Sequence, residues 1–150
     1  MPKILAICPT LNRPEKLAFM MDSFLMTRSE HTDIHLCYEE QPTTKCFNDS
    51  VKQRPDYDFY MMLNDDIIFR TNHWDIRLME TIQSNGNGIA YGDDLVQRNR
   101  MPTFPMVSKS IVEALGWLQM PSLEYLYGDN VWKHIGEQCK CLYYVPDVII

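Results

Sequence analysis

The chain has 150 residues, a length that favours one domain, residues 1–150, around a single hydrophobic core. Hydrophobic residues make up 45% and charged residues 23%, as in ordinary globular proteins, and no apolar run is long enough to cross a bilayer. The formal net charge of −6 argues against nucleic acid as a main partner, because a phosphate backbone attracts basic surfaces.

Cysteine usage indicates a reducing environment. The chain has 5 cysteines, an odd number, and its N-terminal segment lacks the pattern of a secretory signal peptide. We therefore expect free, largely buried thiols and a cytoplasmic location. Cys139 and Cys141 are separated by one residue, but no second pair of Cys or His has zinc-site spacing, so no zinc site is predicted.

Strand-like and helix-like patterns alternate through the first half of the chain, which predicts an α/β fold. Short apolar runs predict strands at residues 3–8, 33–38 and 58–63. A helix begins near Pro14, which suits the first helical turn, and Thr43 or Thr44 is predicted to cap another helix that runs through Gln53. The apolar stripe of the first helix is interpreted as core, and its members are Leu17, Met20, Met21, Phe24 and Leu25.

The same alternation continues in the second half of the chain. Asn72 is predicted to cap a helix, and the buried face of that helix is expected to hold Trp74, Leu78, Met79 and Ile82. An Asn-Gly-Asn-Gly break at residues 85–88 precedes a strand at 89–91. A helix at 108–115 stops at Gly116, another begins near Asp129, and the last predicted strand spans 142–145.

Loops with polar residues follow three predicted strands in succession. The first loop holds Thr10, Asn12 and Arg13 after Pro9, the second holds Glu39, and the third holds Asn64, Asp65 and Asp66. Ligands of open α/β sheets bind beyond the carboxyl ends of the strands, so these side chains are predicted to converge. Two adjacent carboxylates need a positive partner, and a divalent cation with a phosphorylated ligand supplies one. The alternative is a polar turn, in which Asn and Asp serve as turn formers.

The chain resembles GT-A-fold glycosyltransferases of the family 2-like kind found in bacteria and phages. Residues 7–14 resemble the first nucleotide-binding loop of that family, and residues 63–66 resemble its Asp-x-Asp motif. Residues 47–50, 70–75 and 127–130 resemble the helix before that motif, an Arg-Thr-x-Gly-Trp-Asp stretch of phage members, and the catalytic-base motif. The resemblance implies a Rossmann-like α/β/α sandwich of three layers around a mostly parallel sheet. For a viral or phage member the location would be the host cytoplasm.

The resemblance also implies a chemistry. A sugar would pass from a nucleotide-diphosphate donor to a hydroxyl of a sugar, glycan or protein acceptor, with inversion. Mn²⁺ or Mg²⁺ would stabilise the leaving diphosphate, held by Asp66 and assisted by Asp65. Asp129 would be the general base that activates the acceptor hydroxyl. The residues expected to position the donor are Pro9, Thr10, Asn12, Arg13, Glu39, Asn48, Asn64 and Asp65.

Several of these residues have simpler interpretations. Asp129 suits a helix N-terminus, where the helix dipole favours a carboxylate. Asp93 and Asp94 are second candidates on the acceptor side, against a plain turn. Arg98 and Arg100 are interpreted either as a lid over the diphosphate or as a solvated surface loop.

The sequence departs from the family pattern at two points. Asn64 replaces the first Asp of the acidic motif, and no histidine metal ligand follows the last predicted strand before Ile150. The apolar ending suggests a shortened form, or one that pairs its C-terminal edge in a homo-oligomer. Three alternatives therefore remain: a non-catalytic nucleotide-sugar-binding module, a nucleotidyltransferase, and a structural or interaction domain, which would leave the converging acids unexplained. The second lacks its usual support, because residues 9–13 contain no glycine-rich phosphate loop.

Overall fold

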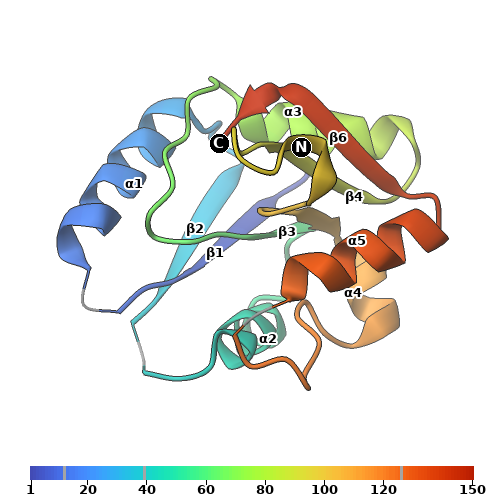
Figure 1. Cartoon of the computed structure of the whole chain (residues 1–150), viewed down its shortest axis with the longest axis horizontal. Coiled ribbons are helices and arrows are strands. Elements are labelled where there is room, and N and C mark those ends of the chain that lie inside the picture. The colour runs from blue at the N-terminus through green and yellow to red at the C-terminus, as the bar shows by residue number, and fades with distance from the viewer. Residues whose placement is uncertain (12, 39, 126) are drawn as a thin grey trace.

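The strands of the computed structural model are β1 (Ile4–Pro9), β2 (Thr32–Cys37), β3 (Phe59–Met62), β4 (Ile89–Asp93), β5 (Met106–Ser108) and β6 (Leu142–Ile149). The helices are α1 (Pro14–Thr27), α2 (Thr43–Gln53), α3 (Trp74–Ser84), α4 (Lys109–Leu115) and α5 (Gly128–Gln138), with a short 3-10 turn η1 (Arg98–Arg100). The structure describes residues 1–11, 13–38, 40–125 and 127–150. Within these residues the strands form one six-stranded sheet in the order β2-β1-β3-β5-β4-β6 (Figure 1).

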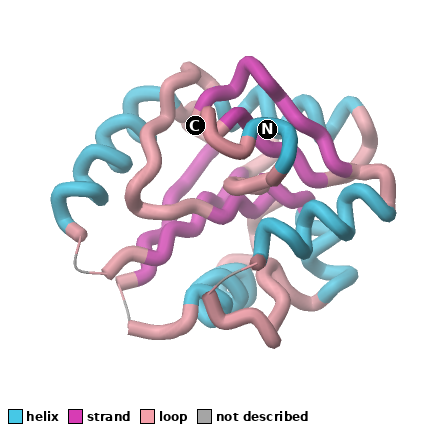
Figure 2. Tube along the Cα trace, in the orientation of Figure 1, coloured by secondary structure: helices cyan, strands magenta, loops and turns pink. Residues whose placement is uncertain are grey.

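The sheet is mostly parallel. β1 pairs in parallel with β2 and β3, and β4 pairs in parallel with β6. Only β5 runs the other way among the described strands, antiparallel to β3 and β4. Because β1, β2 and β3 share one direction, their carboxyl ends meet at one edge of the sheet. The loops that leave β1 and β2 start side by side there, as Figure 2 shows.

Alternating side chains of β1 divide the core between two faces of the sheet. Ile4, Ala6 and Cys8 pack with residues of α1 and α3, whereas Leu5 and Ile7 pack with residues of α2, α4 and α5. Successive strand side chains point to opposite faces, so one apolar strand can serve both layers. The predicted three-layer α/β/α sandwich is therefore confirmed.

Most predicted elements are found within a few residues of their expected ends. Three of the predictions that differ from the structure concern a strand, a core residue and a helix cap. β5 was not predicted, because it has 3 residues and its last one, Ser108, was assigned to the following helix. Leu25 was expected in the core but is 54% exposed, since α1 buries only the side of Met20 and Phe24. Helix α3 is preceded by His73 in a left-handed conformation (φ 53°), so the expected cap at Asn72 is wrong.

The apolar C-terminal residues have an intramolecular explanation. Val148 is fully buried and Ile150 is 8% exposed, both within the core on the α1 and α3 side. The backbone of Ile149 accepts a hydrogen bond from the Arg70 amide and donates one to the Thr71 hydroxyl, at 3.1 and 2.8 Å. Pairing of this edge in a homo-oligomer stays a prediction.

None of the helices in the described residues is long and apolar enough to span a membrane.

The expectation of free cysteines is wrong for one pair. Cys37, at the end of β2, and Cys46, in the first turns of α2, form a disulfide across 9 positions of the sequence. Cys8, Cys139 and Cys141 are free thiols. The pair was missed because the fold, and not the spacing, brings the end of a strand against the start of the next helix. The cytoplasmic location stays a prediction.

Candidate functional site

An acidic corner follows β3, and a basic side chain from another loop already occupies it. The side chain of Asp65 is fully buried, and its Oδ2 accepts hydrogen bonds from Thr10 Oγ1 at 2.7 Å and Arg13 Nε at 3.2 Å. A second guanidinium nitrogen of Arg13 donates to Asp65 Oδ1. Asp66 is more open, with its side chain 38% exposed, and it lies 3.1 Å from Arg13 Nη1 and 3.8 Å from Lys16 Nζ. Arg13 therefore supplies the positive charge that the two adjacent carboxylates require.

The parallel pairing of β1 explains why these residues meet. β1 lies between β2 and β3, so the loop after β1 faces the loop after β3 across one strand spacing. The Thr10 amide donates to the Cys37 carbonyl at 2.9 Å, which extends the β1–β2 pairing into the loop. Arg13 is the residue before α1, and from there its side chain reaches back to Asp65.

The charges of the acidic corner shift the pKa values of two neighbouring side chains, Arg13 and Cys8. Burial works against the charge of Arg13, but hydrogen bonds to Asp65 and the charges of Asp65 and Asp66 raise the pKa of Arg13 above its usual value. Burial, reinforced by the nearby charge of Asp65, raises the pKa of the Cys8 thiol to about 12. The arginine stays charged and the thiol stays neutral at physiological pH.

Two adjoining hollows open beside the corner. The corner hollow, with a volume of about 210 Å³, is lined by Pro9, Thr10, Leu11, Arg13, Cys37, Gln41, Thr43, Cys46, Asp65 and Tyr125. The base hollow, with a volume of about 230 Å³, is lined by Thr43, Phe47, Met62, Leu63, Asn64, Thr103, Gln119, Tyr125, Tyr127, Gly128 and Asp129. Thr43 and Tyr125 line both, so the two hollows are neighbours that share a wall.

The hollows bring together most of the residues singled out in the sequence. Pro9, Thr10, Arg13 and Asp65 line the corner hollow, whereas Asn64 and Asp129 line the base hollow. The distant Asp129 thus shares a site with the acidic loop, although 64 positions of sequence separate it from Asp65. Its Oδ1 accepts a hydrogen bond from the following Asn130 amide, as is usual in a first helical turn. Asn12 and Glu39 lie outside the described residues.

Asn48 is engaged by the protein itself, which changes its interpretation. Its side-chain nitrogen donates to the Gln119 carbonyl at 2.8 Å, and its side-chain oxygen accepts from the Leu118 and Gln119 amides. With both ends of the amide hydrogen-bonded to this segment, Asn48 holds the loop after α4. The expected direct contact with the donor is therefore not favoured by the structure.

The candidates after β4 form a local turn. Asp94 Oδ1 accepts hydrogen bonds from the backbone amides of Val96, Gln97 and Arg98. Burial opposes the charge of this carboxylate, but the backbone hydrogen bonds outweigh it and lower the pKa of Asp94. The guanidinium of Arg100 donates to carbonyls of the same turn. The turn and surface-loop interpretations account for Asp94 and Arg100.

The residues at the corner fit a divalent cation in one way only. Among the described residues, no group of three or more His, Cys, Asp or Glu side chains is close enough to hold a metal ion. Both oxygens of Asp65 are hydrogen-bonded, so the carboxylate that remains for an ion is the more exposed Asp66, which is paired with Arg13 and Lys16 and lines neither hollow. Mg²⁺ and similar hard cations often use one or two carboxylates and take their other ligands from phosphates and water. The donor set therefore fits an ion that arrives as part of a phosphate complex.

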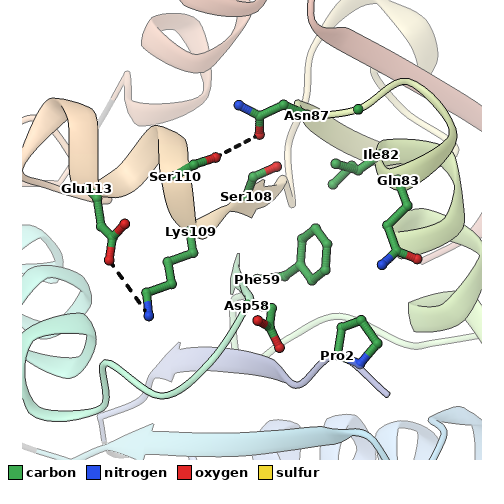
Figure 3. Close-up of a pocket in the computed structure, with 11 residues that line it drawn as sticks. Pro2, Asp58, Phe59, Ile82, Gln83, Asn87, Ser108, Lys109, Ser110 and Glu113 are labelled. Carbon is green, nitrogen blue, oxygen red and sulfur yellow. Dashed lines mark hydrogen bonds and ion pairs between the residues drawn. The ribbon is translucent and has the colours of Figure 1, made fainter.

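A third hollow lies at the opposite end of the sheet, where β3 begins (Figure 3). Its volume is about 380 Å³, and Asp58, Phe59 and Lys109 are among its lining residues. Its polar side chains largely contact each other: Ser110 donates to Asn87 at 3.0 Å, and Lys109 lies 3.7 Å from Glu113. It adjoins none of the strand ends that carry the acidic corner, so it is not the candidate site.

Sequence reasoning missed several residues of the site. Lys16 lies one helical turn after Arg13, so i, i+3 spacing could have linked it to the corner. Gln41 and Tyr125 line the hollows but lie in segments without a periodic pattern or motif, whereas Thr43 and Tyr127 lie in a predicted helix and in the motif at 127–130 and were not assigned to the site. Nothing in the sequence alone connects these segments, because their contacts are made only in the folded chain.

No protein-family model matches the sequence, and a comparison with curated protein sequences gave no match. Solved structures are similar throughout the chain. The mannosyltransferase PcManGT from Pyrobaculum calidifontis, in complex with GDP-Man and Mn²⁺, superposes with a TM-score of 0.76 and 10% identity, over 99% of this chain and 56% of that one. TarS 1-349 from S. aureus gives a TM-score of 0.71 and 9% identity, over 98% of this chain and 59% of that one. This chain thus spans little more than half of either protein.

Two smaller structures are also similar. A197 from STIV gives a TM-score of 0.66 and 12% identity, over 97% of this chain and 83% of that one. A cytidylyltransferase from Leptospira borgpetersenii gives a TM-score of 0.57 and 11% identity, over 96% of this chain and 75% of that one. At identities this low, the similarity of the structures establishes a common fold and nothing finer. That fold is the GT-A type that the resemblance of the sequence motifs predicts.

Proposed function

We propose that this protein is a glycosyltransferase that moves a sugar from a nucleotide-diphosphate donor to an acceptor hydroxyl. The observation that carries the proposal is the shared wall between the two hollows. One hollow holds Thr10, Arg13 and Asp65, and the other holds Asn64 and Asp129. A donor that lies across this wall has its phosphates near a guanidinium and its sugar near a carboxylate.

The corner hollow is the proposed place of the nucleotide diphosphate. Arg13 is 42% exposed at its side chain, so its guanidinium can turn from Asp66 toward a phosphate while Asp65 continues to orient it. Mn²⁺ or Mg²⁺, when bound with the diphosphate, offsets the negative charge that develops on the leaving group. Asp66 is the protein ligand we assign to that ion.

The base hollow is the proposed place of the acceptor. Asp129 accepts the proton of the acceptor hydroxyl. The oxygen of that hydroxyl bonds to the anomeric carbon as the bond between this carbon and the phosphate oxygen breaks. Attack from the side opposite the diphosphate gives inversion. The acceptor is a sugar, a glycan or a protein hydroxyl.

Nucleotide-sugar binding and nucleotide release test this function. We expect thermal stabilisation by a nucleoside diphosphate that increases with Mn²⁺ and is lost in Asp66→Ala. We also expect Asp129→Asn to retain donor binding and to lose nucleotide release, because the amide cannot take the proton. Glu80→Gln, at an exposed carboxylate of α3, is the control that should change neither. If no nucleotide sugar stabilises the wild-type chain with either metal, the proposed function is wrong.

Nucleotidyl transfer is the second candidate, favoured by the similarity to the Leptospira cytidylyltransferase. The two reactions release different products from their donors. A glycosyltransferase releases a nucleoside diphosphate, whereas a nucleotidyltransferase acting on a nucleoside triphosphate releases pyrophosphate. Measuring both products with the same preparation distinguishes them. Donor binding without either product, in a broad acceptor screen, would identify a non-catalytic binding module.

A further inference from the structure

Tyr125 stands on the wall between the two hollows. It lines the corner hollow together with Arg13 and Asp65, and the base hollow together with Asp129. The residue is 60% exposed; Tyr127 is similarly exposed at 64% but lines the base hollow alone, whereas Tyr125 lines both hollows. Within the described part of the chain, its hydroxyl makes no hydrogen bond and its ring makes no ring contact. The side chain is therefore accessible to a ligand from both sides.

The backbone that carries Tyr125 is fastened firmly to α2. The Glu124 carbonyl accepts hydrogen bonds from Thr43 Oγ1 at 2.9 Å and from the Thr44 amide at 3.3 Å, and Thr44 Oγ1 also donates to the Leu123 carbonyl. Asn48 holds the same loop further back, at Leu118 and Gln119. An exposed ring on an anchored backbone is a preorganised contact surface, because little ordering is needed when a ligand arrives.

We propose that Tyr125 is a positioning residue that stacks on the sugar ring of the donor. This inference rests on the proposed function and names a residue for it. A sugar transferred from a diphosphate at Arg13 to a hydroxyl at Asp129 must pass the wall that Tyr125 forms. The C–H face of a pyranose is apolar with a slightly positive edge, and it suits the negative face of an aromatic ring. Stacking there holds the anomeric carbon between the leaving group and the base.

The test compares two ligands that differ only in the sugar. Binding of a nucleotide sugar and of the matching nucleoside diphosphate is measured by calorimetry for wild type, Tyr125→Ala and Tyr125→Phe. We expect Tyr125→Ala to bind the nucleotide sugar about fivefold to tenfold more weakly, while its affinity for the diphosphate is unchanged. Tyr125→Phe keeps the ring and should bind both ligands as wild type does.

Tyr38→Ala is the matched control, since Tyr38 is 64% exposed and lines neither hollow. It should bind both ligands normally, and equal thermal midpoints for all variants show that the fold is intact. Unchanged nucleotide-sugar binding in Tyr125→Ala overturns the proposal. An equal loss for both ligands also overturns it, because the ring would then contact the nucleobase. If wild type binds neither ligand, the proposed function itself is wrong and the role of Tyr125 falls with it.

Discussion

Two carboxylates of this protein, Asp65 and Asp75, are both completely buried, yet they have different partners. Asp75, in the first turn of α3, accepts hydrogen bonds from the Ser29 amide and hydroxyl at 2.8 and 2.6 Å and from Thr32 Oγ1 at 2.6 Å. Its other oxygen accepts from the Ile76 amide. Asp65 instead accepts from one hydroxyl, that of Thr10, and from the charged guanidinium of Arg13.

The difference shows that burial alone does not mark a functional acid. The donors to Asp75 are a backbone amide and two short hydroxyl side chains, which have little freedom to turn toward another partner. This carboxylate therefore fastens α3 to the connection between α1 and β2. The guanidinium of Arg13 is 42% exposed at the mouth of a hollow, so it can exchange its partner for a ligand. A buried carboxylate with a mobile, charged partner beside a hollow is the better candidate for function.

The largest expected effect is the loss of the structural carboxylate. Asp75→Ala leaves the Ser29 and Thr32 donors unpaired in the interior, so we expect the free energy of unfolding to fall by about 3–4 kcal/mol. Chemical denaturation followed by circular dichroism measures it. Asp147→Ala is the control, because Asp147 is 69% exposed and its ion pair with Arg77 should contribute under about 1 kcal/mol. A loss for Asp75→Ala no larger than that of the control would contradict the comparison.

Next comes the disulfide that supports the wall of the corner hollow. Reduction of Cys37–Cys46 with a dithiol removes a constraint on a short loop and so raises the entropy of the unfolded chain. We therefore expect the free energy of unfolding to fall by about 2–3 kcal/mol. Unfolding curves with and without dithiothreitol measure it, and the double variant with Cys37→Ala and Cys46→Ala should no longer respond to the reductant. Alkylation followed by mass spectrometry should label the exposed Cys139 first and Cys37 only after reduction.

A smaller loss of stability is expected at the functional carboxylate. Asp65→Asn keeps the shape and a Thr10 contact, and the released guanidinium of Arg13 can turn to Asp66 or to water. We expect the free energy of unfolding to fall by about 1–2 kcal/mol, well below the loss for Asp75→Ala. Nucleotide binding, in contrast, should be lost, because Arg13 is no longer oriented. A stability loss as large as that of Asp75→Ala would remove the distinction between the two acids.

The smallest effect near neutral pH concerns Cys8, which is buried beside Asp65. Its pKa in the folded protein, about 12, lies above the ordinary value of 9.0, so the neutral thiol favours the folded state. This contribution is complete below pH 9 and is lost as the pH rises toward 12, by at most about 1.4 kcal/mol per pH unit. The free energy of unfolding, measured between pH 8 and 11, should therefore fall less steeply with pH in Cys8→Ala than in wild type. Equal slopes for the two proteins would contradict the assignment.

Local chemistry in the sequence determined much of the architecture. Local signals predicted the end of α2 at Gln53 and the stop of α4 at Gly116, whose φ of 78° suits glycine, but the cap of α2 is Pro42 and not the expected Thr43 or Thr44. The alternation of strands and helices predicted an α/β fold, the family resemblance implied its three layers, and the polar strand ends predicted where a site would form. These features depend on residues a few positions apart, so they can be recognised without the fold.

Only the tertiary structure decided which side chains meet. The pairing of Arg13 with Asp65, the use of Asn48 by the loop at Leu118, and the wall formed by Tyr125 each join residues more than 50 positions apart. The central strand β5 is recognisable only from its neighbours, β3 and β4. Such contacts follow from strand order and helix placement, which depend on the packing of the whole core and leave no period or spacing in the sequence.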